Sequence, residues 1–421
     1  MTTPAKTVEF GPFTMGMNNR LSDMALSKLK EKRLRSIVNT DLTSDGTMRR
    51  RQGYAQALAG SDCHSLWSDG DRAFFVDGTT LYSLSGEADA LTKTQVRTGF
   101  APGRRLSYVN VNGDVIYTDQ SVLRKITDGV DGPLTMPLIQ PEPVVAAGGS
   151  GALDAGVYQV CFTYYDADLR QSGATTPQQV TVAAGQGIQI TGLPAAFPTG
   201  VDGIMVYMTP ANGDQLMLAL ALSAAQTTLS IVTPPLLGGR CQTLLMAPMP
   251  AGEIVRYNNG RLMVALGRFL IYSDPYSLAL HRPMRNFIHF ADDVTVVETV
   301  PAGTFVATEK MTYFFGGDIA TAEAKEVFPY GGVQGTGGPT PDSSRCFWMS
   351  ARGMIVGNSD GSAKNVTEAD IAMNRAVVGA TSYRERDGIK QMIASLFSTQ
   401  QTGAAAYSFM DAEIIRKGES L

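Results

Sequence analysis

The chain has 421 residues, of which 44% are hydrophobic and only 18% are charged, and its formal charge at pH 7 is −4. This length favours two domains with sizeable cores, and the acidic balance argues against a protein that holds nucleic acid by neutralising its phosphates. The acidic balance does not exclude a protein whose surface forms the wall of a channel for DNA, because attraction between that surface and the phosphates would hinder sliding. The 44 glycines and 21 prolines fall between short apolar runs, which is typical of many short strands joined by tight turns.

The cysteines and the N-terminus suggest a protein made in the cytosol. Cys63, Cys161, Cys241 and Cys346 have neither metal-ligand spacing nor a disulfide-dense pattern, which predicts buried, reduced thiols. The opening MTTPAKTVEFGPF lacks the pattern of a signal peptide. No apolar run approaches the roughly 18 residues of a membrane span, so we expect a soluble protein without a membrane-spanning segment.

Residues 1–45 are predicted to form an irregular N-terminal arm with one short helix. Ser22 and Asp23 can cap the segment LSDMALSKLKEKRLRS at its start. This segment carries five basic residues, Lys28, Lys30, Lys32, Arg33 and Arg35.

Beyond the arm, the chain repeats a unit of two apolar strands joined by a tight turn ending in Gly. Such turns are predicted at Asp69-Gly70, Asp77-Gly78, Asn112-Gly113, Asn259-Gly260, Ala302-Gly303 and Arg352-Gly353. Asn-Gly and Asp-Gly suit two-residue hairpins, because both turn positions must take positive φ.

The spacing of these turns predicts a β-propeller. Gly70 and Gly113 are 43 residues apart, as are Gly260 and Gly303, and Gly353 follows after another 50. A period of about 40–50 residues built from short strands is typical of four-stranded propeller blades. The interval of 147 residues from Gly113 to Gly260 breaks the period, and removing about 100 residues there would restore it.

The interrupting stretch has the features of an inserted domain. A flexible leader, residues 141–151, and a proline-rich return, residues 245–252, enclose six or seven short apolar runs. Such a series describes a small β-sandwich of the fibronectin-III or immunoglobulin type. The predicted fold class is therefore all-β, a β-propeller with an inserted β-sandwich.

The predicted domains are the arm (1–45), the propeller (46–146 and 248–421) and the inserted sandwich (147–247). Residues 46–58 read as a strand, and residues 389–397 and 404–417 read as two or three more. Pairing of these N- and C-terminal strands would close the propeller and remove its open edges.

The histidines do not form a catalytic pattern. His64 follows Cys63 on a predicted strand, where neighbouring side chains point to opposite sides and cannot form a nucleophile pair. His281 and His289 have no carboxylate at ligand spacing.

Two other segments imitate functional motifs. GGVQGTGG (331–338) is followed by Pro-Thr-Pro-Asp, so no helix can begin there to receive a phosphate, and we interpret it as a mobile loop. Asp292 and Asp293 diverge as strand neighbours, unlike the two facing acids of a glycosidase. We therefore expect neither an enzyme, nor a cofactor, nor a metal site.

Arg49, Arg50 and Arg51 form the densest basic cluster. On a strand, Arg49 and Arg51 share one face and Arg50 lies on the other. Salt bridges to carboxylates on a neighbouring strand or subunit are the ordinary interpretation, and contact with DNA is the alternative. Together with Arg33 and Arg35, these arginines are our candidates for contacts with other subunits or an adaptor protein.

Several segments spread over nearly the whole chain carry a resemblance. At the start they are FGPFTMGMNNRLSD, LRSIVNTDLTSDGTMRRRQGY and CHSLWSDGDRAFFVDGTTLYSL, in the insert GVYQVCFTYYDADLRQSGATTP and VYMTPANGDQLMLAL, and at the end YRERDGIKQMIASL and DAEIIRKG. These segments resemble the tail nozzle proteins of short-tailed bacteriophages, also described as tail tubular or packaged-DNA-stabilisation-like proteins.

The resemblance implies a structural virion protein, assembled in the bacterial cytoplasm, that forms a homo-hexameric ring under the portal and adaptor. Such a ring lines the DNA exit channel, helps to retain and eject the genome, and touches DNA only transiently. A nearby neck or hub position stays open. The alternative is a receptor- or carbohydrate-binding propeller of the tail, which exposed aromatic residues clustered on one propeller face would favour.

Overall fold

The computed structural model describes residues 11–43, 45–51, 55–87, 90–373, 375–386, 389–398 and 416–417. In these residues the regular elements are one helix, α1 (Asp23–Ser27), and strands that form antiparallel sheets. The chain divides into two compact units, residues 1–105 with 290–421 and residues 106–289. Each unit is described by itself.

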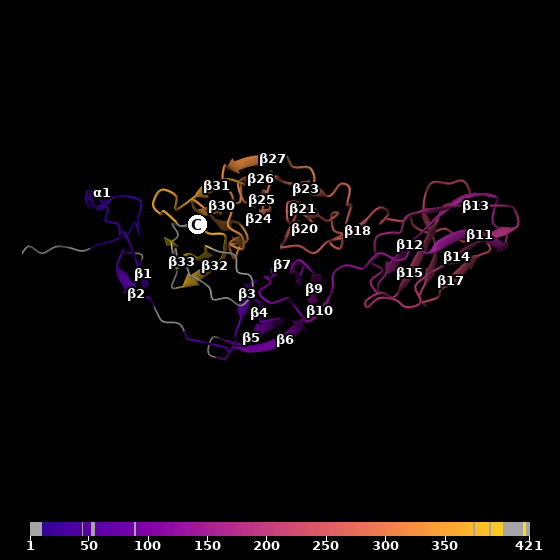
Figure 1. Ribbon diagram of the computed structural model, residues 1–421, viewed down its shortest axis with the longest axis horizontal. Coiled ribbons are helices and arrows are strands. Elements are labelled where there is room, and N and C mark those ends of the chain that lie inside the picture. The colour runs from indigo at the N-terminus through magenta and orange to yellow at the C-terminus, as the bar shows by residue number, and fades with distance from the viewer. Residues whose placement is uncertain are drawn as a thin grey trace, which may run out of the picture. The chain divides into compact units, whose positions relative to one another are not determined.

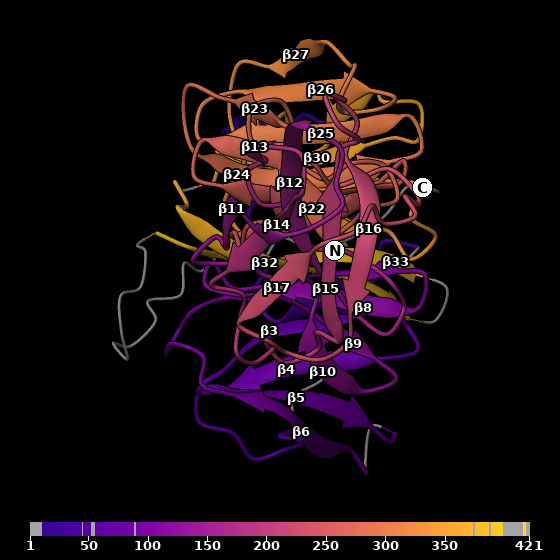
Figure 2. The same ribbon diagram turned by 90° about the vertical axis from the view of Figure 1, so that its right-hand side faces the viewer.

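The first unit begins with the arm and continues into propeller blades. The arm carries α1 and a two-stranded sheet of β1 (Thr40–Leu42) and β2 (Met48–Arg50). Three four-stranded sheets have their strands side by side in chain order (Figures 1 and 2). They are β3 (Cys63–Ser68), β4 (Ala73–Asp77), β5 (Thr80–Ser85) and β6 (Thr92–Thr98); β24 (Val294–Val300), β25 (Gly303–Thr308), β26 (Thr312–Gly316) and β27 (Ala324–Phe328); and β28 (Gly338–Pro339), β29 (Cys346–Ser350), β30 (Gly353–Gly357) and β31 (Ala363–Asn365). A further sheet holds β32 (Val378–Arg386), β33 (Ile389–Phe397) and β34 (Arg416–Lys417).

Apolar side chains hold successive sheets of this unit together. Phe305 of β25 packs in one cluster with Trp348 and Ile355 of the next sheet, and Met349 of that sheet packs in a second cluster with Leu396 of β33. All five side chains are at most 1% exposed. Since burying one large apolar side chain stabilises by about 1.5–3 kcal/mol, these clusters are the main source of this unit's stability.

The second unit contains two more four-stranded blades and a short two-stranded sheet. The blades are β7 (Ser107–Val111), β8 (Asp114–Thr118), β9 (Leu123–Thr127) and β10 (Val130–Pro133); and β19 (Ile254–Asn258), β20 (Arg261–Leu266), β21 (Phe269–Tyr272) and β23 (Phe287–His289). The short sheet pairs β18 (Ala247–Pro248) with β22 (Leu280–His281). Val111 and Ile116 of the first blade share a buried cluster with Val255 and Leu262 of the second.

Between these two blades in sequence lies a β-sandwich. One sheet holds β11 (Val144–Ser150), β14 (Gln186–Thr191) and β17 (Thr228–Ile231), and the other β13 (Gln178–Val182), β12 (Gly156–Tyr165), β15 (Gly203–Met208) and β16 (Met217–Leu222). Val160, Phe162, Ile188, Ile190 and Val206 fill its core. On β14 the alternation of Ile188 and Ile190 with exposed Gln189 matches the period of two of a half-buried strand.

The chain segments at the entrance and at the exit of the sandwich both form hydrogen bonds to residues 174–176. Near the entrance, a carboxylate oxygen of Glu142 accepts a hydrogen bond from the Thr176 backbone N–H (3.0 Å). Near the exit, the Thr243 carbonyl accepts one from the Ala174 N–H (3.1 Å). The chain therefore leaves the sandwich beside the place where it enters.

These sheets confirm the predicted fold class, an all-β fold of propeller blades with an inserted β-sandwich. The strands of the sandwich run from residue 144 to residue 231, close to the predicted insert. The domain boundaries at 45, 146 and 247 stay predictions, because the compact units divide elsewhere, after residues 105 and 289.

The predicted hairpin turns agree with the structure to different degrees. Asn112-Gly113 and Asn259-Gly260 are two-residue turns with positive φ at both positions, as predicted. Asp77 instead pairs with Thr80, so that turn is Gly78-Thr79. The Asp69-Gly70 turn spans four residues, 69–72.

In two hairpins the glycine lies one position later than predicted. Gly303 and Gly353 are the first residues of β25 and β30, so the turns before them consist of the two preceding residues. A Cβ on Gly303 would lie 2.0 Å from the Phe315 carbonyl oxygen, which explains the need for glycine at a strand position. Gly70, Gly113, Gly260 and Gly303 all precede or begin the second strand of their sheets, whereas Gly353 begins a third strand.

The predicted closure by N- and C-terminal strands is wrong for the described residues. Strand β2 pairs with β1, so that Arg49 lies opposite Asp41, and it does not pair with a C-terminal strand. A local hairpin loses less loop entropy than a pairing across hundreds of residues. Residues 389–397 form β33 as predicted, and most of 404–417 lies outside the described residues.

Candidate functional site

The five candidate arginines lie within residues 11–51, which comprise the described part of the predicted arm and the β1–β2 hairpin that continues it past residue 45. This whole stretch is called the arm from here on. This segment contains nine Lys or Arg and four Asp or Glu, a net charge of +5. Residues 1–10 add one charge of each sign, and the whole chain has −4, so the other 370 residues carry −9. The chain is therefore divided into a basic arm and an acidic remainder.

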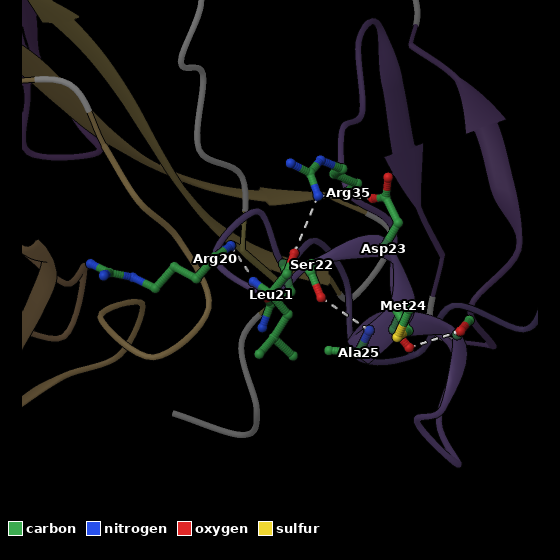
Figure 3. Close-up of polar contacts among 9 residues, drawn as sticks. Arg20, Leu21, Ser22, Asp23, Met24, Ala25 and Arg35 are labelled. Carbon is green, nitrogen blue, oxygen red and sulfur yellow. Dashed lines mark hydrogen bonds and ion pairs between the residues drawn. The ribbon is translucent and has the colours of Figure 1, made fainter.

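Helix α1 is short, as predicted, and covers only the start of the segment that Ser22 and Asp23 can cap. Ser22 caps it as expected, since its Oγ accepts a hydrogen bond from the Ala25 N–H (3.3 Å; Figure 3). The helix ends at Ser27, and none of its residues is buried. A basic segment without a buried apolar face lacks the packing that stabilises short helices, and Leu34 instead forms a bridge with Met17.

Arg33 and Arg35 both have carboxylate partners within the chain. Arg35 Nη1 lies 2.8 Å from Asp23 Oδ1 and donates to the Leu21 carbonyl (3.3 Å), beside the start of α1 (Figure 3). This pair is exposed, so it contributes little stability. Arg33 pairs with Asp370, and here the side chains are only 16% and 21% exposed.

Asp370 is also the centre of the contact that holds the arm. Its Oδ1 accepts a hydrogen bond from Asn18 Nδ2 (3.0 Å), and Asn18 is 2% exposed. Asn19 donates its Nδ2 to the Ala372 carbonyl (3.0 Å) and accepts from the Ala372 N–H (2.6 Å). The arm is thus tied to residues 370–372 by these side chains and by one backbone hydrogen bond, from the Asn19 N–H to the Asp370 carbonyl (3.0 Å), and not by a sheet.

The hairpin of β1 and β2 presents the arginine cluster. Arg51 Nη2 lies 3.2 Å from Asp41 Oδ1 on the neighbouring strand, which confirms the salt-bridge interpretation for this residue. Arg49 lies opposite Asp41 in the register, and Arg49 and Arg50 are exposed. In the connecting turn, hydrogen bonds from Thr43 and then Thr47 lower the pKa of Asp45 to about 2.

The arm also exposes many large apolar side chains. They are Met15, Leu21, Met24, Leu29, Val38 and Met48. Met24 is 69% exposed and Val38 is 76% exposed. These exposed side chains are available for contact with another protein, and a contiguous apolar patch is typical of such a contact surface.

Sequence reasoning missed a second exposed surface, an apolar groove on the second unit. The groove has a volume of about 410 Å³ and is lined by Phe269, Ile271, His281, Pro283, Met284 and Phe287. The Phe269 ring centre lies 5.9 Å from that of Phe287 and 4.8 Å from that of His289. Burial lowers the pKa of His281, so its ring is neutral at pH 7.

The side chains weighed as catalytic or metal-binding candidates in the sequence have ordinary partners within the fold. His64 Nδ1 lies 2.8 Å from Ser65 Oγ, while Cys63 lies opposite Asp77 on the next strand. Asp292 pairs with Lys310 (2.6 Å). In the described part of the chain, no group of three or more His, Cys, Asp or Glu could hold a metal ion.

Two smaller predictions need correction. The four cysteines are free as predicted, but only Cys161 and Cys346 are buried, while Cys63 is exposed. The segment 331–338, interpreted from the sequence as a mobile loop, is instead bound to a neighbouring strand by backbone hydrogen bonds, among them one from the Val333 N–H to the Met349 carbonyl (2.7 Å).

No family model matches the sequence, and no curated protein matches it. Among solved structures it is similar to BBS1N in complex with ARL6DN, with a TM-score of 0.35, 9% identity and coverage of 83% of this chain and 89% of that chain. It is also similar to hydrazine synthase of Kuenenia stuttgartiensis (TM-score 0.33, 8% identity, 87% and 99%). A third similar structure is a putative 6-phosphogluconolactonase from Bacteroides uniformis (TM-score 0.31, 13% identity, 73% and 84%). Similarities this low carry no functional argument.

Within the described residues, no helix has the length and apolar character needed to cross a membrane.

Proposed function

We propose that the protein is a structural component of a bacteriophage tail. It forms a ring of identical subunits, a homo-hexamer, in the tail nozzle or tube under the portal and adaptor. The ring lines the DNA exit channel and helps to retain and eject the genome. Its place is the virion, assembled in the host cytoplasm.

The observation that carries this proposal is the composition of the arm. A helix without buried residues, six exposed apolar side chains and a net charge of +5 describe a segment made to contact another protein. A segment that projects from one subunit to a different surface of the next makes a head-to-tail contact, and such contacts give a closed ring when the rotation completes. Arg49 and Arg50, both exposed, are the residues of this contact.

The charge of the rest of the chain supports a channel wall. Duplex DNA carries one negative charge per about 1.7 Å of its axis, and each well-placed Lys or Arg adds a phosphate contact that must be broken during exit. Outside the first 51 residues the chain carries −9, so the wall is neutral to acidic. DNA can then slide past it without sticking.

The test is a symmetry-resolved reconstruction of the virion tail, together with the mass of the purified protein with and without its adaptor. We expect a six-fold ring, and loss of the ring in Arg49→Glu/Arg50→Glu. The control is Arg240→Glu/Arg375→Glu, which reverses two exposed arginines that are not on the arm. A single copy per tail, or a peripheral fibre-like position, would refute the proposal.

The apolar groove favours a second candidate function, receptor or carbohydrate binding by the tail. Its exposed Phe269 and Phe287 are the kind of aromatic cluster that such binding uses. The only polar side chain in its lining is His281, however, and sugar recognition needs several placed hydrogen-bonding groups. The groove therefore fits an apolar anchor of a protein better than a sugar, and loss of host adsorption by Phe287→Ser in intact virions would test this.

A further inference from the structure

The acidic remainder of the chain offers a surface that matches the arm. A groove of about 480 Å³ lies between strands β26 and β27 and residues 360–362. The carboxylates of Glu323 and Asp360 line it together with the Phe314 ring and Lys325. Glu326, one residue further along β27, is also exposed, on the opposite face of the strand from Lys325. The groove itself combines an aromatic ring with two carboxylates and one opposing charge.

Two sheet edges face outward at these surfaces. Strand β27 is the last strand of its sheet, and β2 is the last strand of the arm hairpin. The first three residues of β27 and all three residues of β2 are exposed. Outermost strands with exposed residues are sites where another chain can add a strand.

We propose that strand β2 of the arm docks into this groove on a second copy of the chain. Arg50 faces the carboxylates of Glu323 and Asp360, and Arg49, on the other face of the strand, lies on the side of Glu326. Met48, which is exposed, packs against the Phe314 ring, since sulfur–aromatic contacts are favourable. This contact rests on the proposed function, because it is the head-to-tail contact from which a ring is built.

A second copy is the occupant that the observations favour. Both the arm strand and the groove remain exposed in a single chain, while Asn18 and Arg33 tie the arm to Asp370 of that chain. The two surfaces are opposite in charge, so they attract each other between copies, whereas groove against groove or arm against arm would repel. Lys325 opposes the incoming arginines and limits the strength of the contact.

The test uses charge reversal on each side of the contact. Arg49→Glu/Arg50→Glu and Glu323→Lys/Glu326→Lys should each weaken self-association by about tenfold or more, measured by sedimentation at low salt. The chain that carries all four changes should regain assembly. An equimolar mixture of the two double variants should also regain assembly, with the two variants alternating, because each arm then meets a groove of opposite charge.

A gain-of-function variant makes the test independent of misfolding. Lys325→Glu removes the opposing charge and should strengthen assembly by about tenfold at low salt, with the control Lys364→Glu on the exposed part of β31 leaving it unchanged. If the arm variant disrupts the ring but the four-fold variant does not restore it, the groove is not the partner and the ring proposal stands. If the wild-type chain remains monomeric with and without its adaptor, the contact and the proposed function both fail.

Discussion

Removal of the Asp370 carboxylate should release the arm without unfolding the rest of its unit. In Asp370→Ala, Arg33 loses its ion pair and the buried Asn18 amide loses its acceptor. A hydrogen bond to a charged group contributes about 1.5–3 kcal/mol, and a buried amide left unpaired costs about 1–3 kcal/mol. The backbone contact from the Asn19 N–H to the carbonyl of residue 370 survives the change. We therefore expect the arm to open more easily by about 2–3 kcal/mol.

The assay is limited proteolysis with trypsin, which cleaves after the lysines between residues 28 and 32. A change of about 2–3 kcal/mol raises the population of the open arm by about 30- to 150-fold, and cleavage follows that population when the arm recloses quickly. Thermal unfolding of the remaining protein should not change, because the apolar clusters around Phe305 and Met349 do not involve the arm.

Glu368→Ala is the matched control, because it removes a carboxylate two residues away. Glu368 is partly exposed and lies 3.6 Å from Arg352, so its loss should leave the arm in place. Equal cleavage rates in Asp370→Ala and the wild type would show that side chains at Asp370 do not hold the arm. An equal acceleration in both variants would refute the assignment of the anchor to Asp370.

Three further predictions concern the blades and the insert. Burial holds the pKa of His281 below 6.5. The second unit should therefore be stable above pH 6.5 and lose stability as the pH falls below it, because the unfolded state takes up the proton first. His281→Gln should reduce this difference in stability, measured by urea unfolding at pH 7.5 and 5.5. Gly353→Ala should cost about 1–3 kcal/mol, since φ is +137° and the new Cβ would lie 2.4 Å from Thr367 Oγ1, and an unchanged midpoint would contradict this. Excision of residues 147–245 should leave a folded, mostly β protein, as judged by circular dichroism. Excision of residues 147–250 also removes Met249, which is 3% exposed in the blade core. This longer excision should lower the free energy of unfolding by about 2–5 kcal/mol more.

Features that depend on a few neighbouring residues could be predicted from the sequence. Asn112-Gly113 and Asn259-Gly260 form the expected turns because positive φ at both positions is a property of those residue types. Ser22 caps α1 for the same reason. The position of Gly353 one strand later in its sheet could not be predicted, because β28 consists of Gly338 and Pro339 and has no strand pattern.

The contacts of the candidate site depend on residues far apart in the chain. The basic charge of the arm is visible in the sequence, but the partner of Arg33 lies 337 residues away at Asp370. The capping residue of α1 is visible in the sequence, but the residue at which the helix ends is not, because that depends on whether a packing surface is present. The apolar groove joins Phe269 to Phe287 through strand pairing of β21 with β23, which no local pattern indicates.

The closeness of the two ends of the sandwich has a consequence for how the second unit folds. Its two blades meet across the insert, where the Val255 N–H donates to Ser107 Oγ (3.0 Å) over 148 residues of chain. Closing an unstructured loop of that length costs about 4 kcal/mol of entropy before any blade contact forms. Once the sandwich has folded, Thr176 and Ala174 hold its entrance and exit together, and the remaining loop is short. The order of folding therefore matters: the two blades, whose side chains are not part of the sandwich core, should assemble slowly whenever the sandwich folds after them.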